Sequence, residues 1–182
     1  GSAAARIMPE AQLDELRRWL TRHAHSRKPL FVVSGSAIAP LARQSVDPNA
    51  WSGEDGWIGY PSSLSAVLAH IHTNRIQSVV FVSGDLHLSA WAYLDIGPAG
   101  DTVRAYQVVS SGLFAPLPFA NARACDFDWN RAISVTVGAT PLSIEQHLLS
   151  TIPQQFMRVD VAPAAAGPWT VALRVYDGQG QS

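Results

Sequence analysis

The stretch VVFVSGDLHLS, residues 79–89, decides the fold. Its four leading apolar residues run straight into Ser-Gly-Asp, which is typical of a buried strand that ends in a turn. A predicted helix, PSSLSAVLAHIHTNRI at 61–76, precedes it, and a shorter apolar run, PLFVVSG at 29–35, precedes that helix. A strand, a helix and a second strand in this order predict parallel pairing in an α/β sheet.

The segments before and after this strand–helix–strand unit have other hydrophobic patterns. Residues 9–25 are predicted to form an amphipathic helix, with Leu13, Leu16 and Leu20 on one face. Further strands are predicted toward the C-terminus at 89–96, 102–112, 132–138, 156–162 and 169–177. Short turn-rich segments join the first two and the last two of these runs, which indicates hairpins, whereas SIEQHLLSTI at 143–152 is predicted to be a short helix. The fold class is therefore α/β, with a mixed sheet that becomes antiparallel toward the C-terminus.

Composition narrows the function classes. A net charge of −1 over 182 residues gives no support for a surface that binds nucleic acid or anionic membrane. The single cysteine, Cys125, excludes an internal disulfide framework and a cysteine zinc site, and no neighbour marks it as a nucleophile. No apolar run reaches the roughly 18–20 residues of a membrane span, and no signal peptide is visible, so the compartment stays open.

Asp85 and His87 carry the strongest chemical signal. In extended backbone, residues two apart point to the same side, so these side chains are expected to converge at the carboxyl edge of a strand. Ligands bind at that edge in open α/β sheets. A carboxylate oxygen and an imidazole nitrogen suit Zn, Mn or Fe, and Ser83 and Gly84 would let the backbone turn beside the ion. The alternative is that Asp85 caps the turn and His87 packs against it.

Two further groups of residues are weaker candidates. Ser110 and Ser111 end an apolar strand and are predicted either to support the site or to serve only the turn. Trp57 and Tyr60, with Trp51, lie in the long irregular stretch 36–60 and are predicted either to wall a pocket or to form a small hydrophobic cluster.

Other chemistries lack their motifs. The sequence has no G-x-S-x-G elbow, no G-x-x-x-x-G-K-[ST] loop and no G-x-G-x-x-G turn, which disfavours serine hydrolases and nucleotide-cradling folds. The remaining histidines are interpreted as structural or exposed. In particular, His70 and His72 do not share a helix face.

The quoted stretch resembles the last metal motif of the PhoD-like alkaline phosphatase family, a branch of the calcineurin-like metallophosphoesterases. The resemblance rests on Gly-Asp-Leu-His at 84–87 and on segments in the family's order before and after it. These are LDELRRWL (13–20), LFVVSGSAI (30–38), DGWIGYPSSLSAVLAHI (55–71), YQVVSSGLFAPLPFAN (106–121) and FMRVDVAPAAAGPWTVALRVYDGQG (156–180). It implies that residues 6–182 form the C-terminal part of such a domain, a helix-flanked β-sandwich with a closing hairpin at about 156–177. Residues 1–5 are typical of a cloning scar.

The resemblance also implies what the chain binds and what it lacks. It predicts a phosphate-ester substrate and metal ions (Fe, Zn, Mn or Ca), with Asp85 and His87 as ligands. The family's arginine after Gly-Tyr-Pro is replaced by Ser62-Ser63, and the earlier ligand motifs are not found. We therefore expect weak metal binding, little or no turnover by this chain alone, and either a missing N-terminal half or self-association. The competing hypothesis is a catalytically incompetent binding or scaffolding module that retains the fold.

Overall fold

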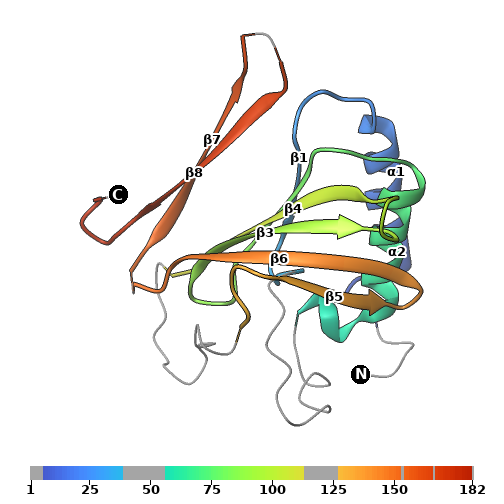
Figure 1. Ribbon diagram of the computed structural model, residues 1–182, viewed down its shortest axis with the longest axis horizontal. Helices are drawn as coiled ribbons and strands as arrows, with labels where there is room; N and C mark the ends of the chain where they lie inside the picture. Colours follow the sequence, from blue (N-terminus) through green and yellow to red (C-terminus); the bar gives the residue numbers. More distant parts are fainter. Residues whose placement is uncertain (1–5, 39–55, 113–126, 153, 166, 182) are drawn as a thin grey trace.

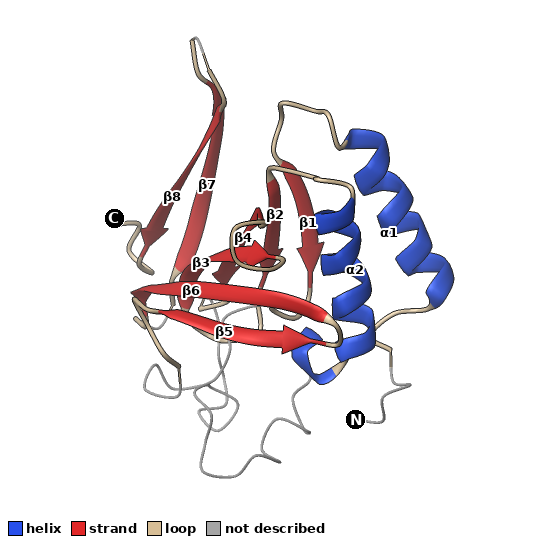
Figure 2. Cartoon of the chain, turned by 45° about the vertical axis from the view of Figure 1, so that its right-hand side comes forward, coloured by secondary structure: helices blue, strands red, loops and turns tan. Residues whose placement is uncertain are grey.

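The computed structural model describes residues 6–38, 56–112, 127–152, 154–165 and 167–181. Two α-helices, α1 (Glu10–His23) and α2 (Pro61–Thr73), lie beside each other on one face of a sheet (Figures 1 and 2). A short 3₁₀ turn, η2 (Trp57–Gly59), leads into α2, whose first residue is Pro61. Proline suits this position because its fixed φ matches the helix and its missing N–H would have had no partner there.

The sheet has six strands in the order β1-β2-β4-β3-β6-β5. These are β1 (Leu30–Ser34), β2 (Val79–Ser83), β3 (Ser89–Ile96), β4 (Val103–Ser110), β5 (Ala132–Val137) and β6 (Thr140–Ser150). β1 pairs parallel with β2, and β2 pairs parallel with β4, whereas β3, β5 and β6 join by antiparallel pairing. The predicted mixed sheet is thereby confirmed, including the parallel β1–α2–β2 unit and the β3–β4 hairpin.

One predicted element is wrong. Residues 143–152 were expected to be a short helix, but they fall mostly within β6, which pairs with β3 on one side and β5 on the other. Leu142 and Ile144 face the buried side of the sheet in alternation, while Ser143 and Glu145 lie on the other face. Over residues 142–145 the strand has a partner on each edge, which satisfies its backbone N–H and C=O groups on both sides and outweighs a local pattern that also fits a helix.

The main hydrophobic core lies between the helices and the sheet. From the helices come Leu13, Leu20, Leu64, Val67, Leu68 and Ile71; from the strands come Val79, Phe81, Ala92, Leu94, Ile96, Ala105 and Ile144, among others. Along β3 the buried positions alternate with half-buried ones, as expected for a strand with one face on a core. This layer fixes the carboxyl ends of β1, β2 and β4, which determine where the candidate site lies.

The last two strands form a unit of their own. β7 (Phe156–Pro163) and β8 (Trp169–Tyr176) pair antiparallel as the predicted hairpin. In Figures 1 and 2 this hairpin stands on the opposite side of the sheet from α1 and α2. Its start is tied to the sheet by Met157, whose backbone N–H donates to Ser110 Oγ at 3.0 Å.

Candidate functional site

Three turns meet where the parallel strands β1, β2 and β4 end. They are Ser-Gly-Ser at 34–36, Ser-Gly-Asp at 83–85 and Ser-Ser-Gly at 110–112. A Cβ added to Gly84 would lie 3.4 Å from Ser111 Cβ and 3.9 Å from the Gly35 carbonyl oxygen. The three backbones are therefore in near contact, at the edge of the sheet where α/β proteins bind ligands.

Asp85 and His87 project from the middle turn of the three. Asp85 is exposed and His87 is half-buried. The backbone here is bent rather than extended, with φ of 79° at Asp85 and 53° at His87. We expected the alternation of an extended strand to place both side chains on one side. That expectation was wrong, because the backbone is not extended at these residues. Two left-handed residues so close together are uncommon outside glycine, and such backbone is found preferentially at functional sites.

The serines serve the backbone of the turns. Ser111 Oγ accepts a hydrogen bond of 2.8 Å from the backbone N–H of His87, and Ser110 Oγ accepts the one from Met157. A hydroxyl has one donor and two acceptor positions, so each bond leaves the hydroxyl hydrogen for a further partner. Ser111 thus holds the turn that carries Asp85 and His87, and Ser110 holds the base of the hairpin.

Ser83 is hydrogen-bonded to a buried polar side chain that was not predicted from the sequence to belong to the site. Its Oγ receives a 2.8 Å hydrogen bond from Nε2 of Gln107, a side chain with no exposed surface in the middle of β4. A signal for Gln107 was present, because a glutamine stands where the alternation of β4 calls for an apolar residue.

The two aromatic candidates lie differently. Trp57 is only 2% exposed, belongs to the main core, and donates through Nε1 to Ser34 Oγ at 2.8 Å. It also lines a hollow of about 370 Å³ beside β1, with Val32 and Ser36 among its neighbours. Tyr60 is half-buried at the start of α2. Trp57 therefore supports the end of β1, and Trp51 and Cys125 lie outside the described residues.

The donor atoms of Asp85 and His87 suit a transition metal, but their number does not complete a site. Across the described residues, no group of three or more His, Cys, Asp or Glu side chains is placed to hold a metal ion. A catalytic metal normally takes at least three protein ligands. These residues therefore fit at most part of a metal centre.

His70 and His72 have hydrogen-bond partners away from this edge. His70 Nε2 lies 2.8 Å from Thr21 Oγ1, between α2 and α1, and burial lowers the pKa of its imidazole. His72 Nε2 lies 2.7 Å from the backbone oxygen of Asp101. Hydrogen bonding to Arg75 is the main cause that lowers the pKa of the Asp101 carboxyl. We therefore still interpret His70 and His72 as structural residues.

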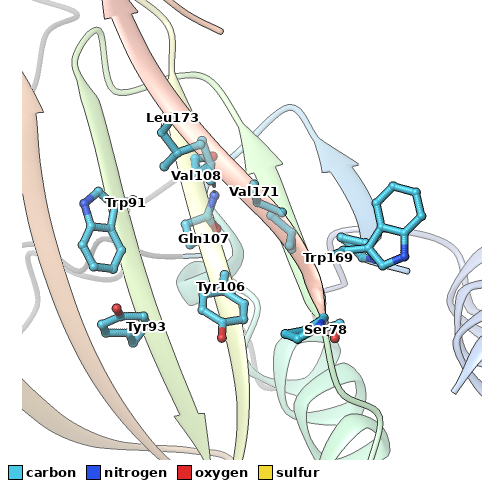
Figure 3. Close-up of a pocket in the computed structure, with 12 residues that line it drawn as sticks. Ser78, Trp91, Tyr93, Tyr106, Gln107, Val108, Trp169, Val171 and Leu173 are labelled. Atoms are coloured by element: carbon cyan, nitrogen blue, oxygen red, sulfur yellow. Dashed lines mark hydrogen bonds between the residues drawn. The ribbon is translucent and has the colours of Figure 1, made fainter. Parts of the chain in front are cut away.

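A separate cleft of about 460 Å³ lies on the face of the sheet away from the helices. Figure 3 shows Trp91, Tyr93 and Tyr106 on β3 and β4, beside the strand that carries Val171 and Leu173. Trp91 stacks on His147 with ring centroids 4.2 Å apart. None of the three turns contributes to the lining of this cleft, so it is distinct from the edge that carries Asp85 and His87.

Comparison with protein families gives a match between residues 1–119 and the model of the PhoD-like phosphatases. The chain belongs to the PhoD-like phosphatase family. The match covers α1, α2 and β1–β4, and with them all three turns of the candidate site. The resemblance inferred from Gly-Asp-Leu-His is confirmed.

Two other comparisons add little to the PhoD-like assignment. A search of the curated proteins finds no match. A solved structure described as "Structure of PhoD" is similar at 14% identity and a TM-score of 0.39, over 91% of this chain and 34% of that one. The chain thus spans about a third of the length of that PhoD protein.

Proposed function

We propose that this chain is the part of a metal-dependent phosphatase that contributes Asp85 and His87 as metal ligands for the hydrolysis of phosphate esters. Membership of the PhoD-like phosphatases supports a phosphatase-type activity. The observation that carries the placement is the convergence of three turns at the carboxyl edge of β1, β2 and β4, with an exposed carboxylate and a half-buried imidazole on the middle one.

The proposal needs ligands from elsewhere. Asp85 and His87 offer two donors, and a hydrolytic metal pair needs several more, including one that bridges the ions. We propose that a polypeptide segment beyond the described residues, or another chain, supplies them. By itself this chain would then bind metal weakly and hydrolyse phosphate esters slowly or not at all.

The second candidate is a binding or scaffolding module that keeps the fold without the chemistry. What favours it is the absence, within the described part of the chain, of a group of three ligand side chains.

Neither α1 nor α2 is long and apolar enough to cross a bilayer, so the described residues contain no membrane-spanning helix.

Elemental analysis of the purified chain after incubation with Fe, Zn, Mn or Ca distinguishes the metal-ligand role from the binding or scaffolding module. Phosphate-ester hydrolysis is assayed on the same samples. The test variant is Asp85→Ala/His87→Ala. The matched control is Glu145→Ala/His147→Ala, which removes another carboxylate and imidazole two residues apart, on β6. Metal retained by the wild type and the control but lost in the test variant supports the ligand role. Equal metal content in all three proteins, at metal concentrations high enough to fill a weak site, would overturn it and favour the binding module.

A further inference from the structure

Gln107 is a polar side chain in an apolar layer. It has no exposed surface and lies on the helix-facing side of β4, between the buried residues Ala105 and Val109. Burying an amide is costly unless its donors and acceptor find partners. An apolar residue would fill this position more cheaply, so the contacts of the amide must explain its presence.

Both the oxygen and the nitrogen of the amide form hydrogen bonds, and their partners lie on different segments of the chain. Oε1 accepts a 3.1 Å hydrogen bond from the backbone N–H of Ile38, in the loop that follows β1. Nε2 donates to Ser83 Oγ at 2.8 Å. It also approaches the carbonyl oxygens of Val108 at 3.0 Å and Phe81 at 3.3 Å.

These partners are close in sequence to two of the three turns that form the candidate site. Ser83 immediately precedes Gly84 and Asp85, and its hydroxyl anchors the point where β2 gives way to the bent turn. Ile38 follows the Ser-Gly-Ser turn of β1, whose Gly35 carbonyl lies close to Gly84. A single side chain therefore connects the turn after β2 with the loop after β1.

We infer that Gln107 is a positioning residue, which fixes the turn carrying Asp85 and His87 relative to the loop after β1. The inference rests on the proposed function for its relevance to phosphate-ester hydrolysis, but the coupling of the two loops is a property of this chain alone. Hydrogen-bonded networks in a low-dielectric interior hold their members in a defined arrangement, which is what a site assembled from separate loops requires.

The chain offers a matched control. Gln146, on β6, is equally buried, and its Nε2 also donates to a backbone carbonyl, that of Asp128 at 2.6 Å. Gln107→Met and Gln146→Met each remove one buried amide from the same sheet. Only the first removes the bonds to Ile38 and Ser83.

Backbone amide exchange followed by NMR tests the coupling without any metal. We expect Gln107→Met to speed exchange at Ile38 and at residues 84–88 by about tenfold relative to Gln146→Met, because one lost hydrogen bond changes a local opening equilibrium by that order. Ser83→Ala is a gentler variant that keeps the rest of the amide contacts. It should speed exchange at residues 84–88 and leave Ile38 unchanged. Equal exchange in the Gln107 and Gln146 variants would overturn the inference.

Mn²⁺ added to the same samples supplies the readout that links positioning to the proposed site. Paramagnetic broadening of the Asp85 and His87 signals should need several times more Mn²⁺ in Gln107→Met than in the wild type and in Gln146→Met. If the wild type shows no broadening while the exchange difference persists, the metal role of Asp85 and His87 fails and the positioning of the turn stands. If broadening is the same in all three proteins, Gln107 does not position the ligands.

Discussion

The backbone N–H of His87 lies 2.8 Å from Oγ of Ser111 and donates a hydrogen bond to it, which joins the turn after β2 to the turn after β4. This bond uses the backbone of His87 and not its imidazole. The serine therefore acts on the turn through the backbone, and its effect is separable from that of the side chains of Asp85 and His87.

Ser111→Ala tests this separation. The substitution leaves the His87 N–H without its acceptor and should lower the free energy of unfolding by about 1 kcal/mol. Amide exchange should rise at His87 and stay unchanged at Met157. Ser110→Ala is the control with the opposite pattern, because Ser110 Oγ accepts from Met157. Matching exchange patterns in the two variants would contradict separate roles for the two hydroxyls.

The left-handed backbone at Asp85 predicts a conflict between stability and function. Its φ is 79°, where an aspartate is disfavoured and a glycine is not. Asp85→Gly should therefore raise the free energy of unfolding slightly, by about 0.5 kcal/mol after the greater entropy of the unfolded glycine chain is counted. The same variant should lose any bound metal.

Ser78→Gly is the control for this effect, because Ser78 has a φ of 62° and lies at the opposite end of β2 from Asp85 and His87. It should give a similar gain in urea-unfolding free energy without a change in metal content. A loss of stability in Asp85→Gly alone would mean that the aspartate side chain caps the turn, as the structural alternative requires.

The prediction from sequence succeeded where burial and pairing follow simple patterns. β2 and β3 have continuous or alternating apolar residues, and both lie where they were expected. It failed at β6, where Gln146 occupies an inward-facing position and hides the period of two. Gln107 also occupies an inward-facing position, but the alternation around it in β4 still predicted a strand. Glutamine at a core position is therefore a usable signal, since its burial requires specific partners.

The spacing of Asp85 and His87 shows a different limit. Alternation places residues two apart on one side only while the backbone is extended. Glu145 and His147, within β6, meet this condition, and their side chains lie 3.1 Å apart. Asp85 and His87 follow the end of β2, where the chain bends twice into left-handed conformations. Those conformations depend on Ser111 and on neighbouring loops, which local sequence does not encode.

Gly112 predicts a tight junction between the site and the hairpin. A Cβ there would lie 2.3 Å from Cγ of Gln155, a residue that is 1% exposed and donates through Nε2 to the Ser150 carbonyl. Gly112→Ala should therefore cost about 1–3 kcal/mol in unfolding free energy, the range for overpacking a filled site. Adding Gln155→Ala should recover part of that loss, because it empties the space. A double-mutant cycle without coupling between the two substitutions would contradict the contact.

His70 predicts a dependence of stability on pH. Burial is the largest cause that lowers the pKa of its imidazole from the ordinary value of 6.5, and the charge of Arg17 adds to it. The unfolded chain then binds a proton more readily than the folded one, so this contribution is present above pH 6.5 and is lost as pH falls toward the lower folded value. Urea midpoints should thus decline less between pH 7.5 and about 5.5 in His70→Gln than in the wild type. His25→Gln, at an exposed histidine, is the control.

The edge of β1 predicts self-association. Val33 is 80% exposed on a strand that, among the described residues, pairs only with β2, and apolar side chains at 7, 8 and 16 line the hollow beside it. An exposed apolar edge strand is a template for pairing with another chain. We expect sedimentation velocity to show concentration-dependent association that Val33→Lys weakens, because a lysine on an edge opposes strand addition. Val161→Lys, which charges a 40% exposed position on β7, is the matched control. Association weakened only by Val161→Lys would place the contact on the hairpin, and a monomer at all concentrations would remove self-association as a route to a complete site.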